Sequence, residues 1–284
     1  MLRVERTVYR DSRPAGATYT AAGVALGAAA GLILDRLLGR RLACVVAASF
    51  SVAGRMLDTE AQRIGEQLQG NDLQQARFAV RSLVGRRSDT LTAEEITRAT
   101  IESVAENAVD AVTAPMMWAA LGGAPAVLAY RAINTMDAMV GHHTERYERF
   151  GWASARLDDL VNWLPARLTS ALTIVPMNDR RSVWPSVVDQ ARSHPSPNGG
   201  LIEGAFAHRL GIRLGGINRY DGRVEDRGLL GAGDPPSTAD IARATALRRQ
   251  VSALSASALM AIELTGAVRS RRELRRGSHG RQLM

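Results

Sequence analysis

Hydrophobic residues along this chain gather in blocks of helical length, separated by polar stretches. Five apolar blocks lie at about 14–38, 42–57, 111–130, 160–178 and 251–268, and polar regions cover 58–110 and 179–250. The first and third blocks contain about 20 uncharged residues each, enough to span a bilayer. Alternating strand patterns are scarce. The pattern predicts an all-α, polytopic integral membrane protein forming a single domain, with amphipathic helices and a polar loop region. From hydropathy alone, the alternative is a soluble Ala-rich helical protein.

Glycine and proline residues divide these blocks. Gly39, between the first two blocks, predicts a helical hairpin. The third block contains Pro115, Gly122, Gly123 and Pro125, which break helices. Because polar motifs lie on both sides of this block, we expect it to enter and leave the membrane on one side, with both chain ends in the cytoplasm. The arginine-rich tail at 269–276 is typical of a cytoplasmic anchor.

The composition narrows the possible chemistry. The 284 residues carry a net charge of +8, and all 36 basic residues are Arg. The absence of Lys excludes Schiff-base and Walker-type lysine mechanisms and leaves Arg to bind phosphate or carboxylate, although a GC-rich genome explains most of this bias. The arginines are scattered among acids, so we expect no nucleic-acid partner. Cys44 alone cannot form an intrachain disulfide, and no secretory signal opens the chain.

The polar region 58–110 is expected to form three helices, and the third of them carries an acidic stripe. Thr92 and Glu95 fit a capping box at the start of this helix. Glu102, Glu106 and Asp110 then fall on one helical face. A solvated acidic face is the ordinary interpretation of such a stripe. The functional interpretation is a Mg²⁺ site, because hard cations bind carboxylate oxygens and share phosphate ligands.

Two further polar sets flank apolar blocks. Arg131, Asn134 and Asp137 share a helical face after the third block, where a helix leaving the membrane would also be polar. The second set enters the fourth block and contains Arg156, Asp158, Asp159, Asn162 and Arg167. One interpretation of this set is a simple ion pair between Arg156 and Asp159, three residues apart on a helix, beside an interfacial Trp. Ionisable groups at membrane depth are costly unless they are paired or functional, which favours a site.

A loop rich in Pro and Gly completes the candidate chemistry. It contains His194, Ser196, Asn198, Gly199 and Gly200, with Glu203 following in the first helical turn. The amides at such a helix start can bind phosphate or carboxylate. The alternative is an ordinary turn in which Asn198 caps the helix and Glu203 complements its dipole.

These motifs together resemble the CobD/CbiB family of cobalamin biosynthesis. The resemblance runs from about Tyr9 to about Leu254 and rests on motifs that agree in order and spacing: Glu102–Asp110, Tyr130–Asp137, Phe150–Arg167, His194–Glu203 and Leu214–Tyr220. Family members carry a further apolar segment before the Tyr9–Arg13 stretch, so we expect this chain to be shortened at its N-terminus.

The resemblance implies an adenosylcobinamide-phosphate synthase of the cell (inner) membrane, with an active site that faces the cytoplasm. Such an enzyme joins adenosylcobyric acid to aminopropanol phosphate or threonine phosphate, driven by ATP and Mg²⁺. On this basis, Glu102, Glu106, Asp110, Asp158 and Asp159 are candidate metal ligands. His194, Glu203 and Asp137 are candidate catalytic residues. Arg131, Asn134, Arg156, Asn162, Arg167 and the Ser196–Gly200 segment are candidate substrate contacts. A non-catalytic membrane sensor and a lipid phosphotransferase are the alternatives.

Overall fold

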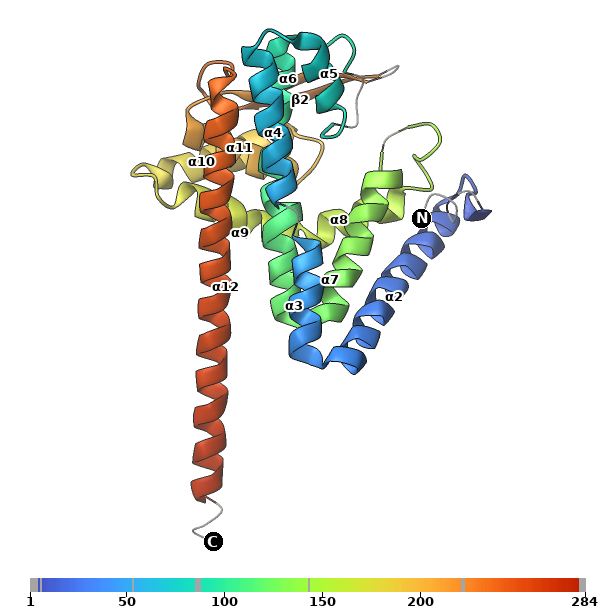
Figure 1. Ribbon diagram of the computed structural model, residues 1–284, viewed down its shortest axis with the longest axis vertical. Helices are drawn as coiled ribbons and strands as arrows, with labels where there is room; N and C mark the ends of the chain where they lie inside the picture. The colour runs from blue at the N-terminus through green and yellow to red at the C-terminus, as the bar shows by residue number, and fades with distance from the viewer. Residues whose placement is uncertain are drawn as a thin grey trace.

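The computed structural model describes residues 5, 7–52, 54–84, 88–142, 144–220 and 223–280, with side chains described as far as Ala261 except at 219, 220 and 223. The fold is mainly helical, as predicted (Figure 1). Its first half contains α2 (Arg13–Leu38), α3 (Arg40–Ser51), α4 (Gly54–Gln69), α5 (Leu73–Val80), α6 (Ala93–Ala108), a π-helical turn η1 (Val109–Thr113) and α7 (Ala114–Val140). Its second half contains α8 (Trp152–Val161), α9 (Trp163–Ile174), α10 (Arg180–Gln190), the short η2 (Ala191–Ser193), α11 (Gly199–Leu210) and α12 (Ala239–Gly280).

A small antiparallel sheet interrupts the second half. Strands β1 (Leu214–Tyr220) and β2 (Arg223–Leu230) pair in a hairpin beside α11. The sequence analysis predicted a loop-rich polar region here. The difference arises because glycines with positive φ, Gly215, Gly216 and Gly228, interrupt the alternation of side chains by which a strand is recognised.

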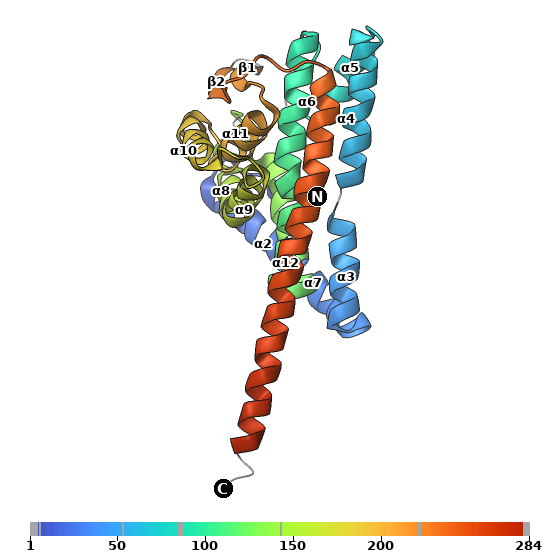
Figure 2. The same ribbon diagram turned by 90° about the vertical axis from the view of Figure 1, so that its left-hand side faces the viewer.

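Two helical hairpins extend away from the β1–β2 sheet, and the C-terminal part of α12 runs on past them (Figures 1 and 2). The first turns at Gly39, whose φ of 74° separates α2 from α3, as predicted. The second turns at Gly123, where a φ of 65° breaks α7 internally. As a result, the Tyr130 hydroxyl donates a hydrogen bond to the Asp110 carbonyl at 3.2 Å, although 20 residues separate them. The third block therefore folds back on itself, as its Gly and Pro residues predicted.

Small residues allow α2 to approach the second arm of α7 closely. A Cβ at Gly27 would lie 2.6 Å from the Leu128 carbonyl oxygen, and one at Gly31 would collide with the backbone of Pro125. Gly23 meets the side chain of Met136 in the same way. These glycines recur every four residues, so they line one face of α2, as in close-packed membrane helices.

Among the described residues, three helical stretches are long and apolar enough to cross a membrane: Arg13–Leu38, Arg40–Gln69 and Ala93–Val140. In the first two stretches apolar side chains face outward, and Leu26, Leu37, Val45 and Phe50 are each more than 60 % exposed, whereas the apolar window of the third stretch is half buried. An outward apolar surface is what a lipid environment requires.

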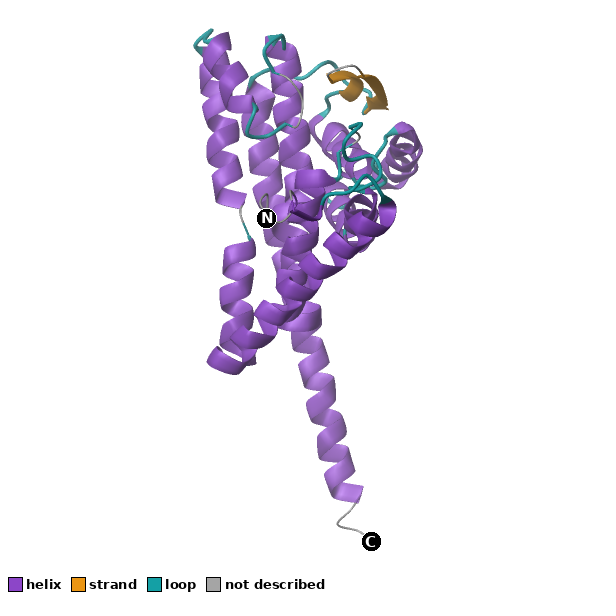
Figure 3. Cartoon of the chain, turned by 90° about the vertical axis from the view of Figure 1, so that its right-hand side faces the viewer, coloured by secondary structure: helices purple, strands orange, loops and turns teal. Residues whose placement is uncertain are grey.

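The fourth apolar block, 160–178, does not form a span. Its helix α9 contains 12 residues, about 18 Å, because the chain turns at Asn162 and the helix ends at Ile174. The fifth block, 251–268, lies within the long helix α12 (Figure 3), but the side chains beyond Ala261 fall outside the described residues. The prediction for the arginine tail at 269–276 concerns side chains in that same undescribed part.

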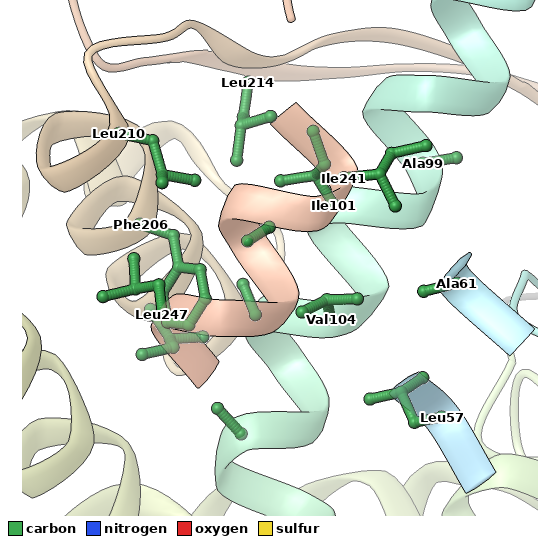
Figure 4. Close-up of a cluster of buried hydrophobic side chains, with 14 of the residues drawn as sticks. Leu57, Ala61, Ala99, Ile101, Val104, Phe206, Leu210, Leu214, Ile241 and Leu247 are labelled. Atoms are coloured by element: carbon green, nitrogen blue, oxygen red, sulfur yellow. The ribbon is translucent and has the colours of Figure 1, made fainter. Parts of the chain in front are cut away.

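The polar regions 58–110 and 179–250 come together in one part of the molecule, which we call the polar half, and this part has its own apolar core. Helices α4, α6, α11 and α12 contribute Leu57, Val104, Phe206 and Leu247, which pack together with Ile241 (Figure 4). The predicted capping box begins α6: the Thr92 hydroxyl accepts from the Glu95 amide, and the Glu95 carboxylate accepts from the Thr92 amide. This packing fixes the helix that carries the acidic stripe.

Candidate active site

The reversal at Gly123 brings the two polar sets that flank the third block to one place. Asp110, in the turn η1 that follows α6, lies within hydrogen-bonding range of the Asn134 side chain on the second arm of α7. Asp137 lies on the same arm, close enough to Glu106 and Asp158 for mutual repulsion. Asp158 lies on helix α8, so residues from three of the sequence motifs lie close together: one motif ends in η1, one lies on the second arm of α7 and one on α8.

Two amide side chains hold Asp158. Asn134 Nδ2 donates to Asp158 Oδ1 at 3.4 Å, and Asn162 Nδ2 donates to Asp158 Oδ2 at 3.0 Å. The Tyr130 hydroxyl in turn donates to Asn162 Oδ1 at 3.0 Å and so fixes that amide. Burial raises the pKa of Asp158 to about 6, and the nearby Asp159 adds to the rise, although the two amides oppose it.

Asp158 belongs to a larger group of carboxylates, which we call the acidic cluster. The cluster contains Glu106, Asp110, Asp137, Asp158 and Asp159. Burial also raises the pKa of Asp159, and Arg156 opposes this rise. Within the described part of the chain, no three His, Cys, Asp or Glu side chains are arranged to hold a metal ion by themselves. A cluster of carboxylates that repel one another still offers the oxygen ligands of a hard cation that shares its shell with phosphate and water.

The three predicted arginines lie around the acidic cluster. Arg131 Nη1 donates to Asn134 Oδ1 at 3.0 Å, and Arg156 is exposed near Asp159. Arg167 stacks over the Trp163 ring at 4.1 Å and donates to Asn198 Oδ1 at 3.3 Å. Guanidinium groups at these positions can receive phosphate oxygens in pairs of hydrogen bonds.

A second group of polar residues lies at the start of α11. His194 Nε2 lies 3.4 Å from Glu203 Oε1, and Arg227 Nη1 lies 3.9 Å from the same oxygen. Glu203 is fully buried. Burial lowers the pKa of His194, and the positive charge of Arg227 lowers it further. His194 is therefore neutral at pH 7, which is the state that a proton acceptor requires.

Glu106 connects this second group to the acidic cluster. Its carboxylate lies close enough to Glu203 for mutual repulsion and interacts electrostatically with Arg227 and His194. Gly199 makes this approach possible, because a Cβ there would lie 3.3 Å from Glu106 Oε1 and 3.1 Å from His194 Cε1. The two groups therefore form one continuous polar site.

The start of α11 differs from the prediction of an open anion site. Ser196 Oγ accepts from the Gly199 amide at 3.0 Å, and the Ser196 carbonyl accepts from the Gly200 amide at 3.3 Å. The Asn198 side chain is no helix cap and instead donates to the Asp159 carbonyl at 2.8 Å. This helix start thus offers an anion fewer free amides than predicted, and Asn198 ties the loop to α8.

Glu102 also differs from its predicted role beside Glu106 and Asp110. Its Oε1 atom accepts from the Gly215 amide at 2.9 Å and lies 3.8 Å from Arg98 Nε. The structure therefore places Glu102 under β1, where it supports the hairpin instead of joining the acidic cluster.

Two residues of the site were not among the predicted ones. Tyr130 is the last residue of the third apolar block. A tyrosine hydroxyl that is buried at such a position needs a hydrogen-bond partner, so the sequence did indicate a polar contact for Tyr130. Arg227 reaches Glu203 only because the β1–β2 hairpin folds over α11, and the sequence pattern did not predict this hairpin.

Comparisons with known proteins identify the family of this chain. Residues 1–248 match the CobD/CbiB protein family. The Cobalamin biosynthesis protein CobD of Mycobacterium tuberculosis is 43 % identical over 272 residues, 92 % of this chain and 85 % of that protein. The proteins of the same name from Geobacter metallireducens and Halalkalibacterium halodurans are 41 % and 42 % identical, over 81 % and 72 % of this chain and 74 % and 65 % of theirs. No solved structure shows significant similarity. The chain therefore belongs to the CobD/CbiB family of cobalamin biosynthesis proteins.

Proposed function

We propose that this protein catalyses ATP-dependent amide bond formation between adenosylcobyric acid and aminopropanol phosphate or threonine phosphate. The observation that carries the proposal is the continuity of the site: a carboxylate cluster flanked by arginines adjoins a buried His194–Glu203 pair through Glu106. The first part suits phosphate chemistry and the second suits proton transfer. Membership in the family supports the corrinoid substrate.

The acidic cluster suits Mg²⁺ bound together with ATP. Asp110, Asp137 and Asp158 would contribute oxygen ligands, while phosphate oxygens and water complete the shell. When bound, the metal would neutralise negative charge on the phosphates of ATP. The phosphate of the amine substrate and the remaining ATP oxygens would be received by Arg131, Arg156 and Arg167.

The proposed reaction has two steps. A carboxylate oxygen of adenosylcobyric acid attacks the γ-phosphorus of ATP, so that ADP leaves and an acyl phosphate forms. The amine of the second substrate then attacks the acyl carbon, the C–O bond to phosphate breaks, and inorganic phosphate leaves. The attacking ammonium must lose a proton, and in this proposal the neutral His194, 3.4 Å from Glu203, would accept it. Because the chain contains no Lys, the amine comes from the substrate.

The test is direct turnover by the purified protein. Detergent-solubilised protein is incubated with adenosylcobyric acid, ATP, Mg²⁺ and each amine phosphate, and the product is measured by mass spectrometry. We expect Glu106→Gln and Asp137→Asn to lower kcat at least a hundredfold, and Asn198→Ala to lower activity less. Glu94→Gln is the matched control, since Glu94 is exposed on the same helix as Glu106. Unchanged amide formation in all three site variants would exclude the site.

The same assay distinguishes the alternatives. A non-catalytic sensor would bind a corrinoid without consuming ATP, and a lipid phosphotransferase would consume ATP with lipid and no corrinoid. We infer that the polar half faces the cytoplasm of the cell membrane, where ATP is available. In a Cys44→Ser background, a cysteine introduced at Asn71, in the polar half, should react with a membrane-impermeant maleimide only from the cytoplasmic side.

A further inference from the structure

A wide cleft opens where α3 gives way to α4. It has a volume of about 810 Å³ and lies between this junction, η1 and α12. Its walls are mostly apolar and include Ala48, Val52, Met56 and Val112. Two guanidinium groups, those of Arg55 and Arg248, also line it. The cleft is separate from the candidate active site, since none of its lining residues belongs to the acidic cluster or to the His194 group.

Arg248 is held rigidly at the wall of this cleft. Its Nε and Nη2 atoms donate to the two carboxylate oxygens of Asp58 at 2.8 and 2.6 Å. Its Nη1 atom lies 3.4 Å from Ser252 Oγ. Gly54 leaves room for this edge, because a Cβ there would lie 2.6 Å from Nη1. The Arg248 guanidinium group is thus held by Asp58 along one edge, and its other edge lines the cleft.

The local charge balance is positive. Arg249 Nη1 lies 4.0 Å from Asp58 Oδ2, so Asp58 faces two guanidinium groups, and the exposed Arg55 adds a third. Three positive groups against one carboxylate leave a net charge of +2 beside an apolar wall. This combination suits an anion that carries an apolar tail.

The cleft also lies at the level where the chain changes from apolar to polar. Below it, α3 exposes Val45 at 62 % and Phe50 at 85 %, and Met56 at the start of α4 is 77 % exposed. Beyond Met56, the outer face of α4 is polar and carries residues such as Arg63. Arginines at this level meet the headgroup region of a bilayer.

We propose that the cleft between α3, α4 and α12 binds an anionic phospholipid. The lipid phosphate lies against Arg55 and the Nη1 edge of Arg248. An acyl chain runs along Ala48, Val52 and Val112 toward the apolar hairpin. Bound lipid fills the space between the α3–α4 junction and α12, and so couples the membrane-facing hairpin to the polar half. This proposal does not depend on the proposed reaction.

Native mass spectrometry of the full-length protein in mild detergent tests the proposal. The protein is titrated with phosphatidylglycerol or phosphatidylcholine, and bound lipids are counted. We expect phosphatidylglycerol to bind at least fivefold more tightly. Arg55→Ala should weaken its binding about fivefold, from about 1 kcal/mol per interfacial Arg. Arg63→Ala, at an exposed position farther along α4, should leave the binding unchanged.

A second pair of variants tests the apolar wall. Ser49→Phe places a bulky ring in the cleft from an exposed position and should weaken binding of both lipids. Val45→Phe adds the same ring about one turn away, at a position that does not line the cleft, and should not. If Ser49→Phe fails to fold, as shown by its thermal unfolding, the Arg55 and Arg63 comparison decides.

Three outcomes would overturn the proposal. The first is equal binding of the two lipids by the unmodified protein. The second is equal loss of affinity in Arg55→Ala and Arg63→Ala. The third is competition by glycerol phosphate at the same concentration as the lipid, because a soluble phosphate source would then suffice and the apolar wall would have no role.

Discussion

Replacing Asp158 by Asn should make the metal-free protein more stable at neutral pH while it abolishes activity. Asp158 is held by Asn134 and Asn162 at 3.4 and 3.0 Å, yet burial raises its pKa from 3.8 to about 6. This rise corresponds to at most about 3 kcal/mol of free energy that opposes ionisation in the folded state. The substituted amide carries no charge, so it escapes that cost, although one of its two hydrogen bonds must rearrange at about 1 kcal/mol.

The sign of the pH dependence follows from the raised pKa. Below about pH 3, Asp158 is protonated in both the folded and the unfolded chain. As pH rises toward 6, the unfolded chain releases this proton before the folded one does, so the folded state loses stability over this interval. Above about pH 6 the loss is complete. The Asn variant should lack this contribution over the whole range.

The assay is unfolding in detergent with EDTA at pH 4.5 and pH 7.5, for the unmodified protein and Asp158→Asn. The stability lost between the two pH values should be greater in the unmodified protein by up to about 2 kcal/mol, because the unfolded chain has already released most of this proton at pH 4.5. Adding Mg²⁺ with ATP at pH 7.5 should restore stability to the unmodified protein and not to the variant. Equal pH dependence in the two proteins would refute the assignment of a strained carboxylate to Asp158.

The other predictions concern packing and are each measured by the unfolding midpoint. Gly31→Ala should destabilise by about 1–3 kcal/mol, because its Cβ meets the α7 backbone, whereas Gly65→Ala, whose nearest neighbour is a side chain at 3.7 Å, should stabilise by up to about 1 kcal/mol. Stabilisation by both substitutions would show that helix propensity outweighs the close contact at Gly31. Thr92→Ala should cost about 1 kcal/mol through loss of the capping box, and no change would mean that α6 is fixed by packing alone. Arg248→Met should cost about 3–5 kcal/mol by leaving Asp58 buried without its partner, and adding Asp58→Asn should recover most of it; no recovery would assign the loss to packing.

The helices of this protein follow from local signals in the sequence. Gly39 ends one apolar helix and starts the next, the Thr92–Glu95 pair begins α6, and the Gly and Pro residues of the third block reverse the chain at Gly123. Each of these signals acts within a few residues, through backbone geometry or a side chain that caps its own helix. Such effects can be seen without knowledge of the fold.

Contacts between distant segments could not be predicted in the same way. The β1–β2 hairpin pairs across an irregular register near Gly215, and its strands carry no clear alternation. The position of Arg227 beside Glu203 could therefore not be predicted. Glu102 accepts a hydrogen bond from the Gly215 amide of this hairpin and so does not join the acidic cluster. Helical spacing placed Glu102, Glu106 and Asp110 on one face, but the partners of each residue depend on which element packs above it.

The reversal at Gly123 explains how a membrane protein can assemble this site from both sides of an apolar block. A straight helix over Ala93–Val140 would separate Asp110 from Asp137 by about 40 Å, at opposite surfaces of the bilayer. The turn instead returns the chain to the side from which it came, and the close packing of α2 on the second arm holds it there. The carboxylates then repel one another in a confined space, which costs stability. In the proposed reaction this cost would be offset on binding, because Mg²⁺ with ATP would bring positive charge to the carboxylates.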